Sequence, residues 1–415
     1  MNLGERFWPA RLGHSFRWLL GSVVVSNLGD GIALAAGPLL VASETRDPLL
    51  VASAVFLQRL PWLLFGVVAG AYVDRLDRRR LVVVMDTGRA AALVLLTVTI
   101  ATGSVSITLI LITMFLLGTA ETFSDLASQT LLVGTVDRSD LGIGNARLQG
   151  GFLVTNHLVG PPIGALLFAL ARSWPFAATA ACYLLGAVLV SRIVLRRRDE
   201  SPRRSVRVEV AEGMRWLWHH PPVRTLAITI VLFNVTFGAA WSVLVLYSQE
   251  RLGLSDAGYG LLITAGALGG LVGTAAYGWL EVNVGLANLM RIGLVLETLT
   301  HLALALTTIP WIALVVMFVF GLHAFVWGTT SRTVRQRAVP DALQGRVGSV
   351  YMIGVIGGIL IGTPIGGALA RGWGITAPFW FGFVGSGILV IAMWRQFSHI
   401  ARETDEQAPD GASAR

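Results

Sequence analysis

Acidic and basic side chains interrupt several apolar stretches that are long enough to cross a membrane. Asp30, Arg59 and Glu121 stand near the middle of three of these stretches. An ionisable group at that depth costs at least about 2.5 kcal/mol, so each one needs a partner or a function. A buried carboxyl group can bind and release a proton, and a nearby guanidinium changes how readily it does so. These three residues are therefore the candidates for proton coupling.

Asp30 and Arg59 also have a structural interpretation. Counted at 1.5 Å per residue from the inner ends of their helices, both lie roughly 18 to 20 Å deep, so we expect them to pair. An ion pair that fixes two helices is then the alternative to a proton-binding site. Glu121, Asp125 and Gln129 follow one face of a later helix, where hydrogen bonding is the alternative role.

A second group of candidates is largely aromatic. Two sets of residues share the spacing i, i+3, i+7, namely Asn234, Phe237 and Trp241, and Phe320, His323 and Trp327. With Asn27, they are the predicted lining of a cavity for a bulky lipophilic or aromatic substrate. Packing between helices is the alternative for these residues. Two further pairs are expected to be scaffold, namely Asp86 with Arg89, and Glu297 with His301.

The composition places the chain among integral membrane proteins. Of 415 residues, 54% are hydrophobic and 13% are charged, against about 25% charged in soluble domains. The mean hydropathy is +0.68. Twelve apolar stretches can each span a hydrocarbon core of roughly 30 Å, which predicts an all-α membrane protein. The expected helices cover residues 18–42, 49–72, 82–101, 106–133, 146–170, 175–195, 225–247, 258–280, 286–308, 310–331, 347–370 and 376–395.

The residue types exclude several chemistries. All 32 basic residues are Arg, so the chain has no Walker A lysine and no Schiff-base lysine. Its one cysteine, Cys182, leaves no intramolecular disulfide or cysteine metal cluster. Neither HExxH nor GxSxG occurs, which argues against a polytopic membrane enzyme. We expect no cofactor, no bound metal and no nucleic-acid partner.

The distribution of arginine predicts the topology. The tails, the inside-facing loops and the adjoining helix ends carry 26 Arg, whereas the outside loops carry four. The positive-inside rule then places both termini in the cytoplasm of a cell whose inner membrane the chain spans. The start of the chain lacks an A-x-A cleavage site and is interpreted as a retained first span.

Two halves of the chain resemble each other. Residues 160–164 (GPPIG) recur as 362–366 (GTPIG), and residues 169–174 (ALARSW) recur as 368–373 (ALARGW). A duplicated six-helix unit explains both pairs and is typical of secondary transporters. The predicted domains are therefore 1–195, a cytoplasmic linker 196–224 with a short amphipathic helix, 225–396, and a disordered tail 397–415.

The loop between the second and third spans carries a family motif. Residues 70–80 read GAYVDRLDRRR, which resembles motif A (GxxxDRxxRR) of the major facilitator superfamily. A plain basic loop is the alternative interpretation. Asp77 replaces a common Gly, a variant found among macrolide and siderophore (enterobactin) exporters of the drug:proton antiporter group. The resemblance implies a cytoplasmic gate in which Arg78 reaches Asp125, together with Gly70, Asp74, Arg75 and Arg79.

A second motif is similar to the motif C element GPxxGG of antiporters. It comprises Gly160, Pro161 and Gly164, although Ala165 replaces the last Gly. A kinked, closely packed helix is the alternative and is compatible with the motif. The resemblance also implies that the glycines of the eleventh span face the second span.

The resemblance implies the fold and function together. We expect twelve helices in two pseudo-symmetric bundles, forming a monomeric exporter of lipophilic or amphipathic molecules driven by protons through alternating access. A lysophospholipid or metabolite carrier without proton antiport is the alternative transporter. The expected partners are a small-molecule substrate, protons and the lipid bilayer.

Overall fold

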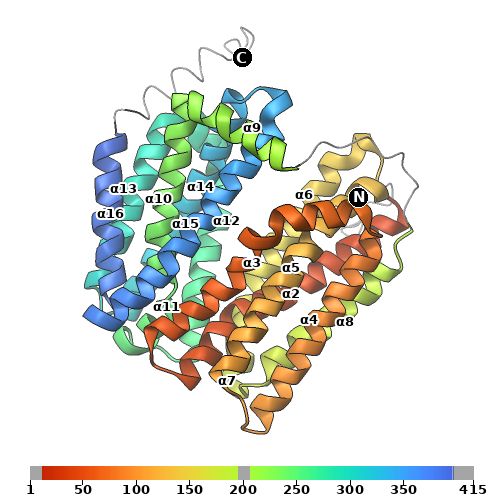
Figure 1. The fold of residues 1–415 in the computed structure, drawn as a ribbon. Coiled ribbons are helices and arrows are strands. Elements are labelled where there is room, and N and C mark those ends of the chain that lie inside the picture. The colour runs from red at the N-terminus through yellow and green to blue at the C-terminus, as the bar shows by residue number, and fades with distance from the viewer. Residues whose placement is uncertain (1–11, 195–205, 395, 397–415) are drawn as a thin grey trace. The chain divides into compact units, whose positions relative to one another are not determined.

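The computed structural model describes residues 12–194, 206–394 and 396, and every regular element within them is helical (Figure 1). The elements are α2 (Gly13–Glu44), α3 (Pro48–Arg75), α4 (Arg78–Ala101), α5 (Ile107–Thr135), η2 (Arg138–Asp140), α6 (Leu141–Phe152), η3 (Leu153–Val159), α7 (Gly160–Leu170), α8 (Trp174–Ser191), α9 (Val206–His219), α10 (Pro221–Trp241), α11 (Leu244–Leu246), η4 (Tyr247–Arg251), α12 (Asp256–Val284), α13 (Leu286–Leu306), α14 (Pro310–Ala338), η5 (Asp341–Leu343), α15 (Gln344–Trp373) and α16 (Ala377–Met393).

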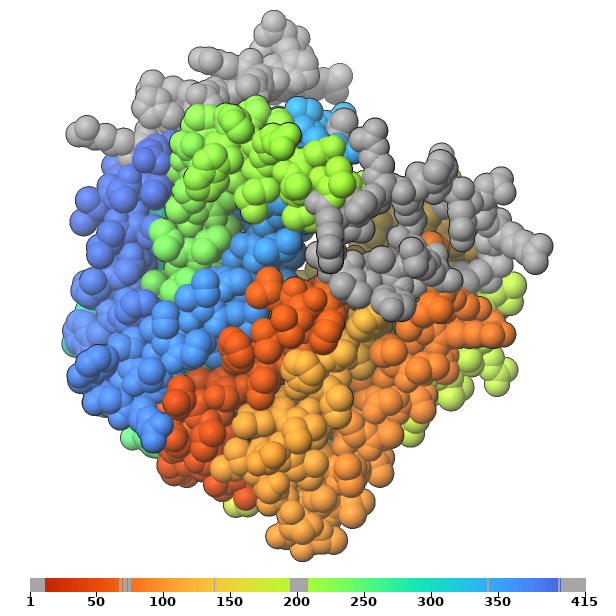
Figure 2. All heavy atoms as spheres, viewed as in Figure 1, coloured from red at the N-terminus to blue at the C-terminus, as the bar shows by residue number. Residues whose placement is uncertain are grey.

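The helices confirm the predicted fold class. Among the described residues, 11 helices are long and apolar enough to cross a membrane, and α16 is a shorter apolar helix. One of these spans, Leu141–Leu170, combines α6, η3 and α7. The orange α4 and the blue α16 lie at the surface in Figure 2 and expose Val, Leu and Ile side chains, as expected of helices that face lipid.

The chain divides into two compact units, which we describe separately. Unit 1 comprises Met1–Arg46, Ser53–Arg203 and Ser255–Thr264, and unit 2 comprises Asp47–Ala52, Arg204–Leu254 and Ala265–Arg415. In unit 1, α2 packs against α7 and α8, and α4 packs against α5 and α8. In unit 2, α10 packs against α15 and α16, and α13 packs against α14 and α16.

Glycine allows α7 to approach α2 closely in unit 1. A Cβ on Gly160 would meet the backbone of Gly31, and one on Gly164 would meet the backbone of Ile32. Small residues at such positions let two helix backbones touch. The motif C-like glycines are thus part of the contact between the first and fifth spans.

The π-helical segment η3 has a cause in the sequence that follows it. Pro161 and Pro162 lack the N–H groups that would bond to the preceding turn. The Gly160 N–H bonds instead to the Thr155 carbonyl, five residues earlier. Such local π-turns often lie at functional sites, and this one carries Asn156.

The glycines of α15 correct an expectation. Gly358, Gly362 and Gly366 lie against the backbone of α10, at Val231, Val235 and Ala239. The ladder therefore packs on the seventh span, not on the second as expected. Near the end of α15, it is Gly367 that lies against Leu49 and Ala52 of α3, within unit 2.

Candidate functional site

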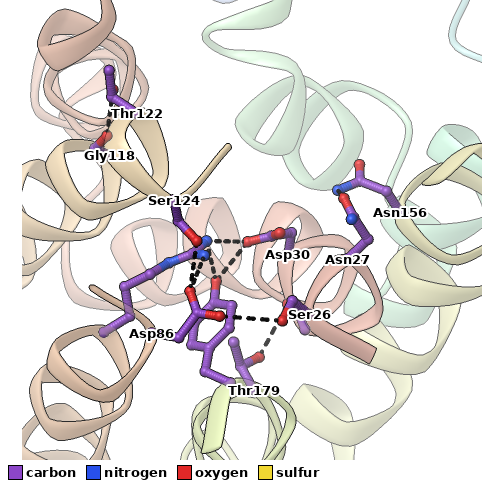
Figure 3. A network of polar contacts seen from close by, with 12 residues as sticks. Ser26, Asn27, Asp30, Asp86, Gly118, Thr122, Ser124, Asn156 and Thr179 are labelled. Atoms are coloured by element: carbon purple, nitrogen blue, oxygen red, sulfur yellow. Dashed lines mark hydrogen bonds and ion pairs between the residues drawn. The ribbon is translucent and has the colours of Figure 1, made fainter. Parts of the chain in front are cut away.

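The guanidinium of Arg89 joins three helices of unit 1. Arg89 lies on α4 and forms an ion pair with Asp30 of α2, and its Nη2 donates to the Tyr183 hydroxyl of α8 at 2.8 Å. That hydroxyl donates to Oδ1 of Asp30 at 2.6 Å. Nη1 of Arg89 lies 3.4 Å from Oδ1 of Asp86, one turn earlier on α4. Figure 3 shows Asp30 and Asp86 on either side of these contacts.

The side chain of Asp86 is more buried than that of Asp30. It accepts a hydrogen bond from Ser124 Oγ of α5 at 3.0 Å and a longer one from Ser26 Oγ of α2 at 3.5 Å (Figure 3). Its side chain is 1% exposed, whereas that of Asp30 is 16% exposed. Asp30 is thus the carboxylate of this pair that water can reach. We call Asp30, Asp86, Arg89 and Tyr183 the Arg89 network.

A small cavity adjoins the Arg89 network. Its volume is about 30 Å³, which is enough for one or two water molecules. It is lined by Asp30, Ala33, Leu34, Gln58, Arg59, Arg89, Leu117, Glu121, Asn156 and Tyr183. Gly118 of α5 lies against the backbone of Gln58, so a close approach of α5 to α3 shapes this wall. The predicted candidates Asp30, Arg59 and Glu121 therefore share one cavity.

The partner of Asp30 differs from the expected one. Arg59 is exposed and lines the same cavity, but the described contacts pair Asp30 with Arg89. An expected start at residue 82 predicts Arg89 near the inner end of its helix. The helix begins at Arg78, which puts Arg89 about 16 Å along it, and the ion pair shows that its guanidinium reaches Asp30.

Sequence reasoning missed Arg89, Asp86 and Tyr183 as site residues. Asp86 and Arg89 were assigned to the scaffold, and Tyr183 was not singled out. A signal for the first two was available, because an acid and an arginine three residues apart inside an apolar stretch need a shared polar environment. Tyr183 gave no such signal, because a tyrosine in an apolar helix is unremarkable by itself.

Part of the predicted cytoplasmic gate lies outside the described residues. This applies to Gly70 and to the side chains of Asp74 and Arg75. Arg79 donates to the Ile193 carbonyl at 3.1 Å, just beyond the end of α8, where a cation is favoured by the helix dipole. Among the described contacts Arg78 and Asp125 are not paired, so that contact stays a prediction.

Asn27 lies beside the π-helical segment of the fifth span. Its side chain donates to the Val23 carbonyl at 2.8 Å and lies 3.5 Å from the amide nitrogen of Asn156 (Figure 3). Asn156 lines the cavity described above. Asn27 thus contacts that wall, although its predicted role toward a substrate stays a prediction.

In unit 2, three of the predicted lining residues form an aromatic cluster. The rings of Phe237 and Trp241 lie 4.7 Å apart, those of Trp241 and Phe320 lie 4.4 Å apart, and those of Phe237 and Phe320 lie 5.9 Å apart. All three side chains are half-buried. This aromatic cluster therefore offers both mutual packing and accessible ring surface.

The other three predicted lining residues are buried. Trp327 is 2% exposed and stacks on Phe233 at 5.5 Å within the apolar core of unit 2. Asn234 donates to the Ile230 carbonyl of its own helix at 2.7 Å. His323 is 3% exposed and lies beside Glu297. The residues that the helical spacing placed on aromatic faces are thus divided between the aromatic cluster and buried positions.

Comparisons with known proteins agree with this architecture. A family model described as "Transmembrane secretion effector" matches residues 7–411. The multidrug efflux pump Tap of Mycolicibacterium fortuitum is 26% identical over 385 residues, which cover 87% of this chain and 90% of Tap. Multidrug resistance protein 1 of Bacillus subtilis (strain 168) is 23% identical over 401 residues, covering 93% of this chain and 97% of that protein.

A solved structure resembles the whole chain. A variant of the nucleoside transporter NupG superposes with a TM-score of 0.75 at 10% sequence identity, covering 93% of this chain and 100% of that one. At this identity the likeness concerns the fold alone.

Proposed function

The chain belongs to the transmembrane secretion effector family of major facilitator transporters, and on that premise we propose that it is a proton-driven exporter of lipophilic or amphipathic molecules. It would work by alternating access, with the substrate leaving the cytoplasm as a proton enters. The names of two relatives, multidrug efflux pump Tap and multidrug resistance protein 1, support the export of such molecules.

The Arg89 network is the observation that carries the proton coupling. One guanidinium faces two carboxylates, so the group has a charge of −1 when both acids are ionised. An uncompensated charge away from water is costly, and binding one proton removes it. Asp30 is the acceptor because it borders the cavity while Asp86 does not. Glu121, on the same wall, is the second candidate.

Protonation of Asp30 would loosen a contact between helices. A neutral carboxyl group no longer forms an ion pair, and Arg89 would keep Asp86 and Tyr183 as partners. The bond between α2 and α4 therefore weakens when a proton binds. This gives the proton a differential effect on helix packing, which any coupled conformational change requires.

Export can be tested in inverted membrane vesicles with ethidium, a lipophilic aromatic cation. An acidic lumen should drive ethidium inward, and collapsing the pH gradient should stop its accumulation. Accumulation that ignores the gradient would support a carrier without proton antiport. Failure of the wild type to move ethidium and a wider panel of lipophilic compounds would contradict the proposed substrate class.

We expect the aromatic cluster to select substrates. Trp241→Ala should change the relative export of different lipophilic compounds several-fold, because Trp241 presents accessible ring surface. Trp327→Ala is the matched control, since Trp327 lies in the core and its loss should cost about 3 to 5 kcal/mol of stability. Export ratios are measured relative to ethidium. Equal ratios in wild type and Trp241→Ala would remove the cluster from substrate recognition.

The proposed orientation places both termini in the cytoplasm. In a Cys182→Ala background, Ala211→Cys on α9 should be shielded from an impermeant thiol reagent in intact cells. Ser104→Cys, in the exposed loop between α4 and α5, should react. Labelling of position 211 but not of 104 would reverse the orientation.

A further inference from the structure

Unit 2 contains a second cluster of ionisable groups, unrelated to the Arg89 network. Glu297 and His301 lie one turn apart on α13, and His323 lies on α14. Nε2 of His301 is 3.1 Å from Oε1 of Glu297, and Nε2 of His323 is 3.2 Å from Oε2. The side chains of Glu297 and His301 are 0% exposed, and that of His323 is 3% exposed. We call these residues the Glu297 triad.

The Glu297 triad must balance its charge largely by itself. α12, which packs on α14 at Gly269 and Gly273, carries Asp256 at its start and Glu281 near its end, where Arg337 pairs with Glu281. No side chain of α16 within Ala377–Met393 is ionisable, and the remaining charged residues of α10, α13 and α14 are arginines near helix ends. These are Arg224 on α10, Arg291 on α13, and Arg332, Arg335 and Arg337 on α14. The ionisable groups in contact with Glu297 are the imidazoles of His301 and His323. A carboxylate at zero exposure therefore needs a positive imidazole.

Both rings retain a position for a proton. Nε2 of His301 forms a hydrogen bond with Glu297, whereas Nε2 of His323 lies near Oε2 of Glu297 without hydrogen-bond geometry. Neither Nδ1 has a hydrogen-bond partner among the described residues. With both rings neutral the triad carries −1, and with one Nδ1 protonated it carries zero. Binding one proton therefore makes the triad electrically neutral. The described residues contain no His, Cys, Asp and Glu set suited to a metal ion.

The aromatic cluster contacts both histidines. The His301 ring meets Trp241 edge to face at 6.0 Å, and the His323 ring meets Phe320 in the same way at 5.4 Å. On the other side, a Cβ on Gly382 of α16 would meet the His301 ring at 2.6 Å. The triad is therefore enclosed by α16 on one side and borders the aromatic cluster on the other.

We propose that the Glu297 triad is a proton-binding site of unit 2 that holds one exchangeable proton and gives it up when a lipophilic cation binds to the aromatic cluster. A cation near Trp241 and Phe320 supplies the positive charge that otherwise comes from the imidazolium. It also competes for the same aromatic rings, which attract either cation. The proton leaves from Nδ1, and the charge of the site is unchanged. The exchange step rests on the proposed function, whereas proton binding does not.

Proton binding is tested by nuclear magnetic resonance of the purified protein in lipid nanodiscs, with ¹⁵N-labelled histidine. The chain has seven histidines, and the His301 and His323 signals are assigned by loss in His301→Gln and His323→Gln. At pH 7 the two rings together should carry one proton beyond their neutral forms. In Glu297→Gln both rings should be neutral. His219→Gln, on the exposed face of α9, is the control and should leave both signals in place.

Two results would overturn proton binding. One is that both rings are neutral in the wild type throughout pH 5 to 9. The other is that Glu297→Gln leaves their charge unchanged. If Glu297→Gln does not fold, the wild-type titration decides, together with His323→Gln, in which His301 alone should hold the proton.

The exchange is tested by calorimetry with tetraphenylphosphonium in two buffers of different ionisation enthalpy, which counts protons released per bound cation. Asp30→Asn isolates the triad and should still release about one proton, while Asp30→Asn/Glu297→Gln should release none. Equal release from these two variants would overturn the exchange. If the wild type does not bind tetraphenylphosphonium, both the proposal of a cationic substrate and the proposal of proton exchange are wrong. Proton binding by the triad is then still tested by the histidine signals.

Discussion

Asp30→Asn is expected to lower strongly the accumulation of ethidium against its gradient in inverted vesicles with an acidic lumen, while downhill movement of ethidium persists. Asparagine keeps the size and hydrogen-bonding capacity of the side chain but cannot bind or release a proton at this position. One proton moving under a force of roughly 150 mV supplies about 3.5 kcal/mol, enough for a gradient of a few hundred-fold. Losing that proton should therefore lower the accumulation ratio by up to that factor, and the proton of the Glu297 triad supports what remains.

The control for this prediction is Glu44→Gln on the same helix. Glu44 is the last residue of α2 and pairs with Arg172 at 3.2 Å, away from the cavity. It should leave accumulation unchanged. Full accumulation in Asp30→Asn would exclude Asp30 from the mechanism and leave Glu121, tested by Glu121→Gln in the same vesicles.

Arg89→Gln is expected to destabilise the protein strongly, and Arg59→Gln is not. The first change leaves Asp30 and Asp86 without their cation, and breaking a buried ion pair from one side costs about 3 to 5 kcal/mol. Arg59 lines the same cavity but is exposed, so its replacement should have little effect on stability. The two arginines form a matched pair of the same chemical type.

Thermal unfolding in detergent measures this difference through the yield of folded protein and the midpoint temperature. Asp86→Asn should partly restore the stability of Arg89→Gln, because it removes one of the two stranded charges. If Arg59→Gln is as damaging as Arg89→Gln, or if Asp86→Asn gives no rescue, the assignment of Arg89 as the charge partner is wrong.

The fold could be predicted because hydropathy alone specifies membrane helices. A helix is the one isolated structure that satisfies every backbone group in lipid, so stretches of about 20 apolar residues predict the spans without knowledge of their packing. Motif A predicted the superfamily from one loop, and the family comparison agrees with it. These inferences are local and do not depend on contacts between distant residues.

The partner of Asp30 could not be predicted by the same reasoning. Depth along a helix follows from counting residues, but the direction of a side chain around the helix depends on packing. Arg59 and Arg89 both line the cavity beside Asp30, and the packing of α4 on α8, which also packs on α2, brings Arg89 to it.

The aromatic residues show the same limit. A spacing of i, i+3, i+7 places Phe320, His323 and Trp327 on one broad face of α14, yet that face is wide enough to contact two environments. Phe320 belongs to the aromatic cluster and His323 lies beside Glu297, whereas Trp327 lies in the apolar core. Glu297 and His301 are visible as a pair in the sequence, but the contact with His323 joins two helices and no local pattern could reveal it.

Proton movement driven by substrate tests the central claim most directly. Proteoliposomes that contain the pH indicator pyranine receive external ethidium, with no pH gradient at the start. For the wild type, entry of ethidium should be accompanied by a rise in lumenal pH, because protons leave in exchange. Asp30→Asn should admit ethidium with a smaller rise, because only the Glu297 triad still exchanges a proton. Ethidium entry through the wild type without any change in lumenal pH would contradict proton antiport.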